Sequence, residues 1–252
     1  EAADVPIRLT HVCELRKENL EGLNLDGIAI TSKFEEILAA DGVRIVCELI
    51  GGLEPARSFI ARALQAGKNV VTANKMLLAF HGPELATIAR ENGVELRYEA
   101  AVAGGVPIIK ALREGLAANR IERVYGILNG TCNYILSRMT YDGFEFEPAL
   151  IQAQKLGFAE TPPDLDVDGH DTAHKCQILA SLCYSTRVDI DSIPVEGVRS
   201  ITHADVAYAM EMGYVIKLLA VIQETDAGLD ARVHPTLLPE AHLLAHVRDE
   251  FN

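Results

Sequence analysis

The sequence predicts an α/β protein in which an incomplete doubly wound parallel sheet domain is followed by an α+β domain. Strand and helix patterns alternate as far as Tyr98, and the segments that join them are short. Beyond that point the alternation stops, and two strand patterns flank a hairpin turn instead. The 252 residues, 49% of them hydrophobic, are enough for two domains with buried cores.

The first two elements are expected between Ile7 and Ala40. Ile7–Cys13 alternates apolar and polar residues, as a short strand does. Ser32 and Glu35 form a capping-box pattern, which predicts a helix through Ala40. The residues Glu1–Asp4 resemble the end of a helix, so we expect that a first strand and helix of the sheet are missing before Ile7.

The next elements continue the alternation. Arg44–Ile50 is almost continuously apolar, which is typical of a strand buried on both faces. Pro55 is expected as the first residue of a helix through Ala66, and Gly67 lies just past its end. We then expect a strand at Val70–Thr72, a helix at Pro83–Asn92 ended by Gly93, and a strand at Val94–Tyr98.

The pattern changes near Gly104, where we place a boundary between domains at residues 1–103 and 104–252. A glycine-rich stretch leads into a helix expected at Pro107–Leu116. The later elements are expected to be a strand at Arg120–Leu128, helices at Thr131–Met139, Glu147–Leu156, Asp171–Tyr184 and Ala204–Met212, and strands at Val215–Gln223 and Leu229–Leu237 around the turn Asp226-Ala227-Gly228. This order indicates an α+β domain.

Composition and charge exclude several classes of protein. The 36 acidic residues exceed the 23 lysines and arginines, for a net charge of -13, whereas a nucleic-acid binder needs positive charge. No apolar run is long enough to span a membrane, and no signal-peptide pattern opens the chain. The five cysteines include no C-x-x-C pair, which favours reduced thiols. We therefore expect a cytoplasmic protein with neither a nucleic-acid nor a membrane partner.

A doubly wound sheet favours a nucleotide ligand, whose usual signature is a G-x-G-x-x-G loop after the first strand. The sequence lacks this loop. Gly51 and Gly52 precede a predicted helix and permit close backbone approach to a cofactor, although an ordinary turn is the more common reason for two glycines. Lys75 follows a strand at its carboxyl end, where such sheets bind ligands, so it is either a ligand contact or a solvated surface lysine.

The segment Gly157–Lys175 concentrates ionisable side chains in a loop and the start of a helix. Asp171 and Lys175 are four residues apart and therefore face the same side of that helix. This spacing usually makes a surface ion pair, but a strongly apolar run follows Lys175, and a lysine that enters a buried helix acts as an acid or base. We expect the carboxylates to hold the ammonium group of an amino-acid substrate while Lys175 faces its reacting oxygen. In the earlier segment Gly126–Leu136, Thr131 is expected to cap a helix.

Four segments resemble the homoserine dehydrogenase family, and the resemblance extends over essentially the whole chain. They are Ala73-Asn74-Lys75, Glu99–Ile109, Gly126–Leu136 and Gly157–Lys175, of which the last two are long and specific. The resemblance implies a Rossmann-like NAD(P)-binding domain and a catalytic and dimerisation domain. It further implies reversible interconversion of L-homoserine and L-aspartate 4-semialdehyde, with NADP or NAD as cofactor, by a homodimer that serves threonine, methionine and isoleucine biosynthesis.

The resemblance also implies roles for single residues. Lys175 matches the proton-transferring lysine of the family. Asp171 and Glu160 match its homoserine-binding carboxylates, and Asp166 matches a further acidic residue of that pocket. Lys75 matches a lysine beside both cofactor and substrate. We therefore expect Lys175, Asp171 and Lys75 to be catalytic.

Cofactor and metal contacts are implied in the same way. Gly157 matches a glycine on the nicotinamide side, and Gly51 is a cofactor contact by its position alone. A sodium site made largely of backbone carbonyls is implied at Glu99, Val102, Gly104 and Val106. His170, His174 and Asp166 form only a loose set, so we do not expect a transition metal.

The sequence also departs from the family pattern. Cys132 stands where threonine or serine is usual, and Pro162 replaces a usual aspartate. Relative to the family, the chain lacks the glycine loop and stops at Phe251-Asn252, before the segment that returns to the cofactor domain. The alternative is therefore an oligomerising or regulatory fragment that keeps the fold without binding a cofactor, although the intact catalytic set favours the enzyme. We expect these 252 residues alone to bind NADPH weakly.

Overall fold

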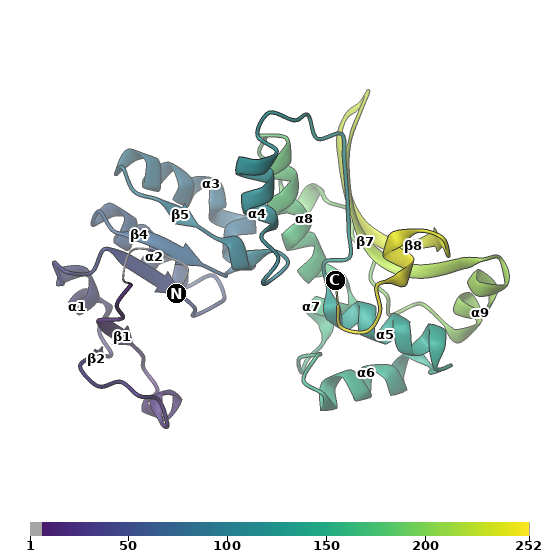
Figure 1. Cartoon of the computed structure of the whole chain (residues 1–252), viewed down its shortest axis with the longest axis horizontal. Helices are drawn as coiled ribbons and strands as arrows, with labels where there is room; N and C mark the ends of the chain where they lie inside the picture. Colours follow the sequence, from purple (N-terminus) through teal and green to yellow (C-terminus); the bar gives the residue numbers. More distant parts are fainter. Residues whose placement is uncertain (1–6, 252) are drawn as a thin grey trace. The chain divides into compact units, whose positions relative to one another are not determined.

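The structure, a computed structural model, describes residues 7–251 and divides into two compact units (Figure 1). The first unit contains the residues up to Asn74 and His81–Arg97, and the second contains Lys75–Phe80 and the residues from Tyr98 onward. A parallel α/β unit and a second, mixed unit confirm the predicted fold class. The domain boundary near Gly104 stays a prediction, and the helix end expected at Glu1–Asp4 lies outside the described residues.

All strand pairs described in the first unit are parallel. They form the sheets β1-β2 and β3-β4-β5, with bounds His11–Cys13, Ala29–Thr31, Ile45–Glu48, Asn69–Thr72 and Leu96–Arg97. Parallel neighbours require crossover connections, and α1 (Phe34–Ala39), α2 (Ala56–Gln65) and α3 (Lys75–Glu91) lie between successive strands from β2 onward. The predicted strands are confirmed, with shorter bounds for β1, β3 and β5 and one more residue, Asn69, in β4. The strand β2 was not predicted.

Strand β3 is not buried on both faces, contrary to the prediction. Glu48 is buried, whereas Ile45 is 52% exposed and Cys47 is exposed. Alternate side chains of a strand point to opposite faces, so this burial is typical of a strand that is covered on one face only. The helix α2 packs against β3 and β4, with Ile60 and Leu64 fully buried.

Two helices begin where the sequence did not predict. Lys33 precedes α1 without a side-chain cap, so the capping box expected from Ser32 and Glu35 is wrong. The hydroxyl of Thr31 accepts a hydrogen bond from the Lys33 amide at 3.0 Å instead. The helix α3 begins well before Pro83 and contains it. Proline removes one backbone hydrogen bond from a helix, and the burial of α3 residues such as Leu77 outweighs this loss.

The ends of α2 lie close to the prediction. Pro55 immediately precedes the helix instead of forming its first residue. Gly67 follows the helix as predicted and has a φ of +73°, which glycine adopts without strain.

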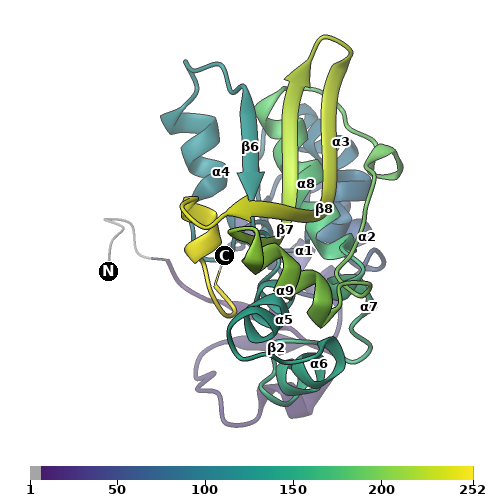
Figure 2. The same ribbon diagram turned by 90° about the vertical axis from the view of Figure 1, so that its right-hand side faces the viewer.

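A three-stranded antiparallel sheet organises the second unit. Strands β6 (Arg123–Gly126), β7 (Tyr214–Thr225) and β8 (Gly228–Pro239) lie side by side in that order (Figure 2). Thr225 pairs with Gly228 across the tip of the β7–β8 hairpin, which confirms the predicted turn. The helices α5, α8 and α9 pack against β7, and α8 also contacts β8.

The helices of the second unit include every one that was predicted there. These are α4 (Ile108–Lys110) continued by the π-helical turn η3 (Ala111–Gly115), α5 (Gly130–Tyr141), α6 (Phe146–Lys155), α8 (His170–Cys183) and α9 (His203–Glu211). The short α7 (Asp164–Val167) was not predicted, nor were the 3-10 turns η1 (Lys17–Leu20) in the first unit and η2 (Glu99–Ala101), η4 (Ile190–Ser192) and η5 (Leu243–His246) in the second. Within the described residues, no helix is long and apolar enough to cross a membrane.

Candidate active site

Asp171 lies at the centre of a cluster of charged and amide side chains in the second unit. It is the second residue of α8 and is only 5% exposed. Its Oδ2 atom accepts hydrogen bonds from Lys175 Nζ at 2.6 Å and from Asn129 Nδ2 at 2.8 Å. Its Oδ1 atom lies 3.0 Å from Lys75 Nζ. The i, i+4 spacing of Asp171 and Lys175 therefore makes a buried ion pair here.

The ammonium group of Lys175 is held by two elements. Besides the bond to Asp171 within α8, Nζ donates to the carbonyl oxygen of Leu128 at 2.5 Å, just beyond the end of β6. The side chain is 15% exposed. Two acceptors fix the position of this ammonium group while part of it still reaches solvent.

Asn129 organises the cluster, although no role was predicted for it from the sequence. It is the N-cap of α5, where its Oδ1 atom accepts a hydrogen bond from the Cys132 amide at 2.7 Å. Its Nδ2 atom donates to Asp166 Oδ1 and to Asp171 Oδ2, both at 2.8 Å. The predicted cap, Thr131, instead donates its hydroxyl to a backbone carbonyl at 2.5 Å. An asparagine directly before a helix is a favoured N-cap, and this signal identifies Asn129.

Cys132 is buried beside the two aspartates. Its Sγ atom donates to the backbone carbonyl of Asp166 at 3.1 Å. Burial, followed by the negative charges of Asp166 and Asp171, raises the pKa of the Cys132 thiol well above its ordinary value. The thiol is therefore a neutral hydrogen-bond donor, as the hydroxyl of threonine or serine would be.

The two aspartates differ in acidity. Burial raises the pKa of Asp171, but the ammonium groups of Lys175 and Lys75 outweigh this effect, and the net pKa lies below the ordinary value. Burial raises the pKa of Asp166, against the hydrogen bond from Asn129, and the charges of Asp171 and Glu160 raise it further. Asp171 thus stays ionised to lower pH, whereas Asp166 takes up a proton more readily than an ordinary carboxyl.

A cavity of about 290 Å³ adjoins this cluster. The predicted residues that line it are Lys75, Asp166, Asp171 and Lys175. The lining residues without a predicted site role are Asn129, Gly130, Thr131, Phe158 and Glu250. Segments that are distant in the sequence therefore meet at one hollow that contains both ammonium and carboxylate groups.

Among the residues predicted to bind the substrate or to lie on the nicotinamide side, Glu160 and Gly157 do not line this cavity. Glu160 is exposed in the loop after α6, where its backbone carbonyl accepts a hydrogen bond from Gln154 Nε2 at 3.3 Å, although its charge acts on Asp166. Gly157 follows the end of α6 with a φ of +80°, and its amide donates to the carbonyl of Gln154 at 3.1 Å. This geometry gives Gly157 a helix-ending role in the chain itself.

The turn at Gly51 and Gly52 lies in the first unit and is open on its outer side. The two residues have φ values of +81° and +68°, and a Cβ atom added to either would meet nothing within 4 Å. The buried Glu48 carboxylate accepts from the amides of Ile50 at 2.7 Å and Gly51 at 3.1 Å, and Asn74 Nδ2 donates to the Gly52 carbonyl at 2.7 Å. The turn is held rigidly with its backbone accessible, which fits the close approach of a cofactor.

The segment of the predicted sodium site is held by Glu99. Its carboxylate accepts from the amides of Ile109 at 2.8 Å and Lys110 at 3.0 Å, at the start of α4. Val102 is fully buried, and Gly104 has a φ of +54°. The described residues contain no group of three or more His, Cys, Asp or Glu side chains that could hold a metal ion. A site of backbone carbonyls is a different kind of site, so sodium stays a prediction.

Both halves of the chain match models of one family. The model described as homoserine dehydrogenase matches residues 107–252, and the model described as homoserine dehydrogenase, NAD binding domain, matches residues 1–99. The first match lies within the second unit, the second match contains the whole first unit, and together they cover almost the whole chain.

Individual relatives agree with these matches. The chain is 48% identical over 91% of its length to a homoserine dehydrogenase of Synechocystis sp., and 44% identical over 98% of its length to that of Neisseria gonorrhoeae. These alignments cover 54% and 56% of the two relatives, so the chain spans about half the length of the curated relatives it matches. A crystal structure of a homoserine dehydrogenase from Thiobacillus denitrificans is 45% identical, with a TM-score of 0.93 over 97% of this chain and 56% of that one.

Proposed function

This chain belongs to the homoserine dehydrogenase family, and we propose on this premise that it forms the core of an NAD(P)-dependent oxidoreductase that interconverts L-homoserine and L-aspartate 4-semialdehyde. The observation that carries the proposal is the pair of Lys175 and Asp171 at the cavity, where a proton donor and substrate-binding carboxylates lie together. The alternative of a fragment that only oligomerises or regulates is not favoured, since the relatives are named as dehydrogenases along the whole match.

Lys175 is the proposed proton donor and acceptor. The chemistry that a nicotinamide cofactor supplies when bound is hydride transfer, and reduction of an aldehyde by a hydride leaves an alkoxide that needs a proton. The ammonium group of Lys175 adjoins the cavity and is oriented by Leu128 and Asp171. In the opposite direction, the neutral amine of Lys175 removes the proton from the hydroxyl group of homoserine.

Asp166, Asp171 and Glu160 are the proposed binding groups for the ammonium end of the amino-acid substrate. Asp171 stays ionised because Lys175 and Lys75 compensate its buried charge. The Asp166 carboxylate lies beside it through the shared contact with Asn129. Glu160 adds negative charge from its loop. Lys75, whose Nζ atom lies 3.0 Å from the other carboxylate oxygen of Asp171, is also proposed to contact the substrate.

Further proposals concern the cofactor, the ion and the assembly. In the first unit, the open turn at Gly51 is a proposed contact for NADP or NAD. In the second unit, Lys75 and Gly157 are proposed as cofactor contacts. A sodium ion is proposed at the carbonyl groups of the segment Glu99–Val106. We also propose that the protein is a cytoplasmic homodimer that serves threonine, methionine and isoleucine biosynthesis.

The test of this function is a substrate assay of the full-length protein that carries this chain. L-homoserine is supplied with NAD⁺ or NADP⁺, and the absorbance of the reduced nicotinamide is followed, with L-serine and L-threonine as matched controls. Turnover of L-homoserine well above that of either control is expected. If L-homoserine is not oxidised with either cofactor, and L-aspartate 4-semialdehyde is not reduced, the proposed function is wrong. The mass of the native assembly in solution tests the homodimer.

A further inference from the structure

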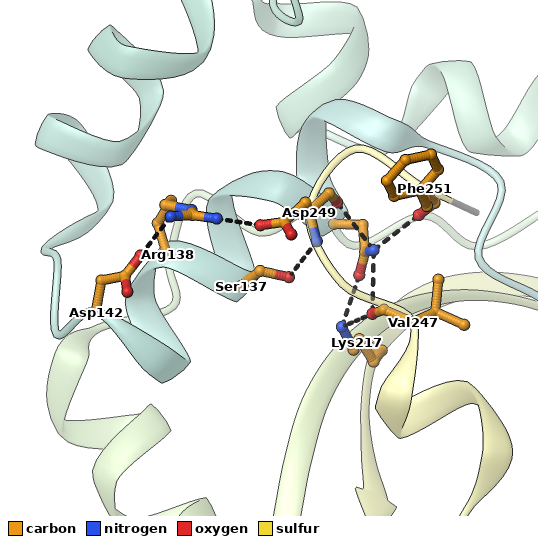
Figure 3. Close-up of polar contacts among 8 residues, drawn as sticks. Ser137, Arg138, Asp142, Lys217, Val247, Asp249 and Phe251 are labelled. Atoms are coloured by element: carbon orange, nitrogen blue, oxygen red, sulfur yellow. Dashed lines mark hydrogen bonds and ion pairs between the residues drawn. The ribbon is translucent and has the colours of Figure 1, made fainter.

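Lys217 is a buried lysine to which the proposed reaction gives no role. It lies in β7 and is only 1% exposed. Its Nζ atom donates to Asn133 Oδ1 at 2.7 Å and to the carbonyl oxygen of Val247 at 2.5 Å (Figure 3). Burial, with the nearby charge of Arg248, lowers the pKa of Lys217 to about 8, and the charge of Asp249 opposes this shift. Burying a cation is costly unless its donors find acceptors. The two contacts are therefore strongly favoured over a buried ammonium group without acceptors.

The second of these acceptors belongs to residues 247–251, which we call the strap. Asn133, in α5, binds the strap through its Nδ2 atom, which donates to the carbonyl groups of Val247 at 3.3 Å, Asp249 at 3.0 Å and Phe251 at 2.8 Å. The same side chain accepts from Lys217 through Oδ1. One buried amide therefore connects the lysine to successive parts of the strap.

The next turn of α5 holds the strap as well. The Ser137 hydroxyl, four residues after Asn133 and on the same helix face, accepts a hydrogen bond from the Asp249 amide at 3.0 Å. Arg138 forms an ion pair with the Asp249 carboxylate and another with Asp142, the latter at 2.6 Å (Figure 3). The strap thus lies along one face of α5, with Lys217 beneath it.

The strap carries Glu250 to the beginning of the same helix. Glu250 lines the cavity together with Lys175 and Asp171. Its carbonyl oxygen lies so near Gly130 that an added Cβ atom there would approach it to 2.6 Å. The φ of Gly130 is not in the left-handed region, so it is this close approach that requires glycine. The strap is therefore one wall of the cavity.

We propose that Lys217 is a positioning residue for substrate binding, because through Asn133 and Val247 it holds the strap at the place where Glu250 walls the cavity. The inference rests on the proposed function, since the wall confines the amino-acid substrate of that reaction. Lys175 is held by Leu128 and Asp171, and not by the strap. Loosening the strap therefore weakens substrate binding and leaves proton transfer largely intact.

The test is Lys217→Met in the full-length protein, which replaces the ammonium group by an apolar chain of similar length. We expect KM for L-homoserine to rise about tenfold, because Asn133 Oδ1 loses its donor and the Val247 carbonyl keeps only its longer bond from Asn133, while kcat stays within about threefold. Hydrogen–deuterium exchange of peptides that cover the strap should become faster, since fewer bonds then hold the strap in the place where the Asp249 amide donates to Ser137. This second readout does not depend on any substrate.

The matched control is Lys68→Met in the first unit. Lys68 is 6% exposed and donates to the carbonyls of Ala40 at 3.0 Å and Val43 at 2.8 Å, so its burial and bonding resemble those of Lys217. Lys68→Met should leave KM for L-homoserine and the hydrogen–deuterium exchange of the strap unchanged. If Lys217→Met does not fold, Ser137→Ala removes one strap bond and should raise KM in the same direction, by about threefold.

The outcomes separate this inference from the proposed function. If the wild-type protein oxidises L-homoserine but Lys217→Met keeps both the wild-type KM and the wild-type strap exchange, the positioning role is wrong. An equal rise of KM in Lys68→Met would also overturn it, since the effect would then be general loss of stability. If the wild-type protein does not act on L-homoserine, the proposed function fails, and unchanged strap exchange in Lys217→Met overturns the positioning role independently.

Discussion

The ion pair of Asp171 and Lys175 combines a helical spacing with burial. An exposed pair at this spacing contributes only about 0.3–0.5 kcal/mol to stability, because solvent screens it. Here the pair lies at a cavity, and Asn129, Lys75 and the Leu128 carbonyl supply the remaining hydrogen-bond partners. Removing one member of such a set leaves the other charge without its partner, which makes single substitutions informative.

Replacement of Lys175 tests proton transfer. Lys175→Ala in the full-length protein should lower kcat by about 10²–10⁴-fold while substrate still binds, because the alkoxide loses its proton donor. The control is Lys155→Ala at the exposed end of α6, which should have wild-type kinetics. Steady-state kinetics with L-homoserine give kcat and KM for both variants. Wild-type turnover by Lys175→Ala would remove this lysine from the mechanism.

The raised pKa of Asp166 predicts that substrate binding depends on pH. The carboxylate form attracts an ammonium group, and the raised pKa means that this form is lost at a higher pH than for an ordinary carboxyl. KM for L-homoserine should therefore rise as the pH falls through that range. Asp166→Asn should have a KM raised by about tenfold near neutral pH and should lack this dependence.

The control for Asp166 is Asp164→Asn. Asp164 is exposed and pairs with Arg199 at 2.7 Å, away from the cavity lining. This variant should keep the wild-type KM profile. A KM–pH profile of Asp166→Asn that coincides with that of the wild type would show that another group binds the ammonium.

At the scale of elements, the start of α5 joins helix capping to the site. Asn129 caps the helix through Oδ1 and holds Asp166 and Asp171 through Nδ2, so that one residue serves both purposes. The next turn of α5 contributes Asn133 and Ser137 to the strap contacts. Successive turns of one helix thus support the carboxylates and the part of the cavity wall formed by Glu250.

A pair of cap variants separates these purposes. Asn129→Ala and Thr202→Ala each remove the N-cap of a helix, α5 and α9 respectively, and each should lower the free energy of unfolding by about 1 kcal/mol. Only Asn129→Ala should also lower kcat/KM, by at least about tenfold, because the aspartates lose a shared donor. Denaturant unfolding and steady-state kinetics measure the two effects. Equal kinetics in both variants would contradict the role given to Asn129.

At the scale of the whole molecule, the two units carry different parts of the proposed chemistry. The first unit has the open glycine turn, and the second has the cavity with its ammonium and carboxylate groups. The chain changes unit inside α3, whose first residues, including Lys75, belong to the second. Among the residues that line the cavity, Lys75 is thus the closest in sequence to the first unit.

Ligand-specific protection tests this division. Bound ligand slows local opening at its contacts, so NADPH should slow hydrogen–deuterium exchange in peptides that contain Gly51 and Gly52. L-homoserine should instead slow exchange in peptides that cover 126–136 and 164–175. Both measurements use the full-length protein, with peptides of α9 as an internal control. Protection of the glycine turn by L-homoserine alone would contradict the assignment.

Local sequence information was sufficient for a large part of the fold. The alternation of strands and helices, the β7–β8 turn and the Asp171–Lys175 spacing depend on residues close together in the chain, and all are confirmed. Helix starts were less predictable. At Ser32 and Thr131 several nearby polar groups compete for the same amides, whereas Pro83, expected to begin a helix, lies inside α3. The exposure of Ile45 depends on what covers a sheet face, which lies outside any local pattern.

The sequence by itself determined the fold class, the family and the residues Lys75, Asp166, Asp171 and Lys175 of the cavity, because these follow from periodicity and from contiguous motifs. Only the tertiary structure decided the bridging role of Asn129 and the contacts of Lys217. The acceptors of Lys217 lie 84 and 30 positions away along the chain, and Asn129 reaches Asp171 across 42 positions. Burial makes such long-range hydrogen bonds obligatory, since a polar group withdrawn from water must find its partner wherever the fold places one.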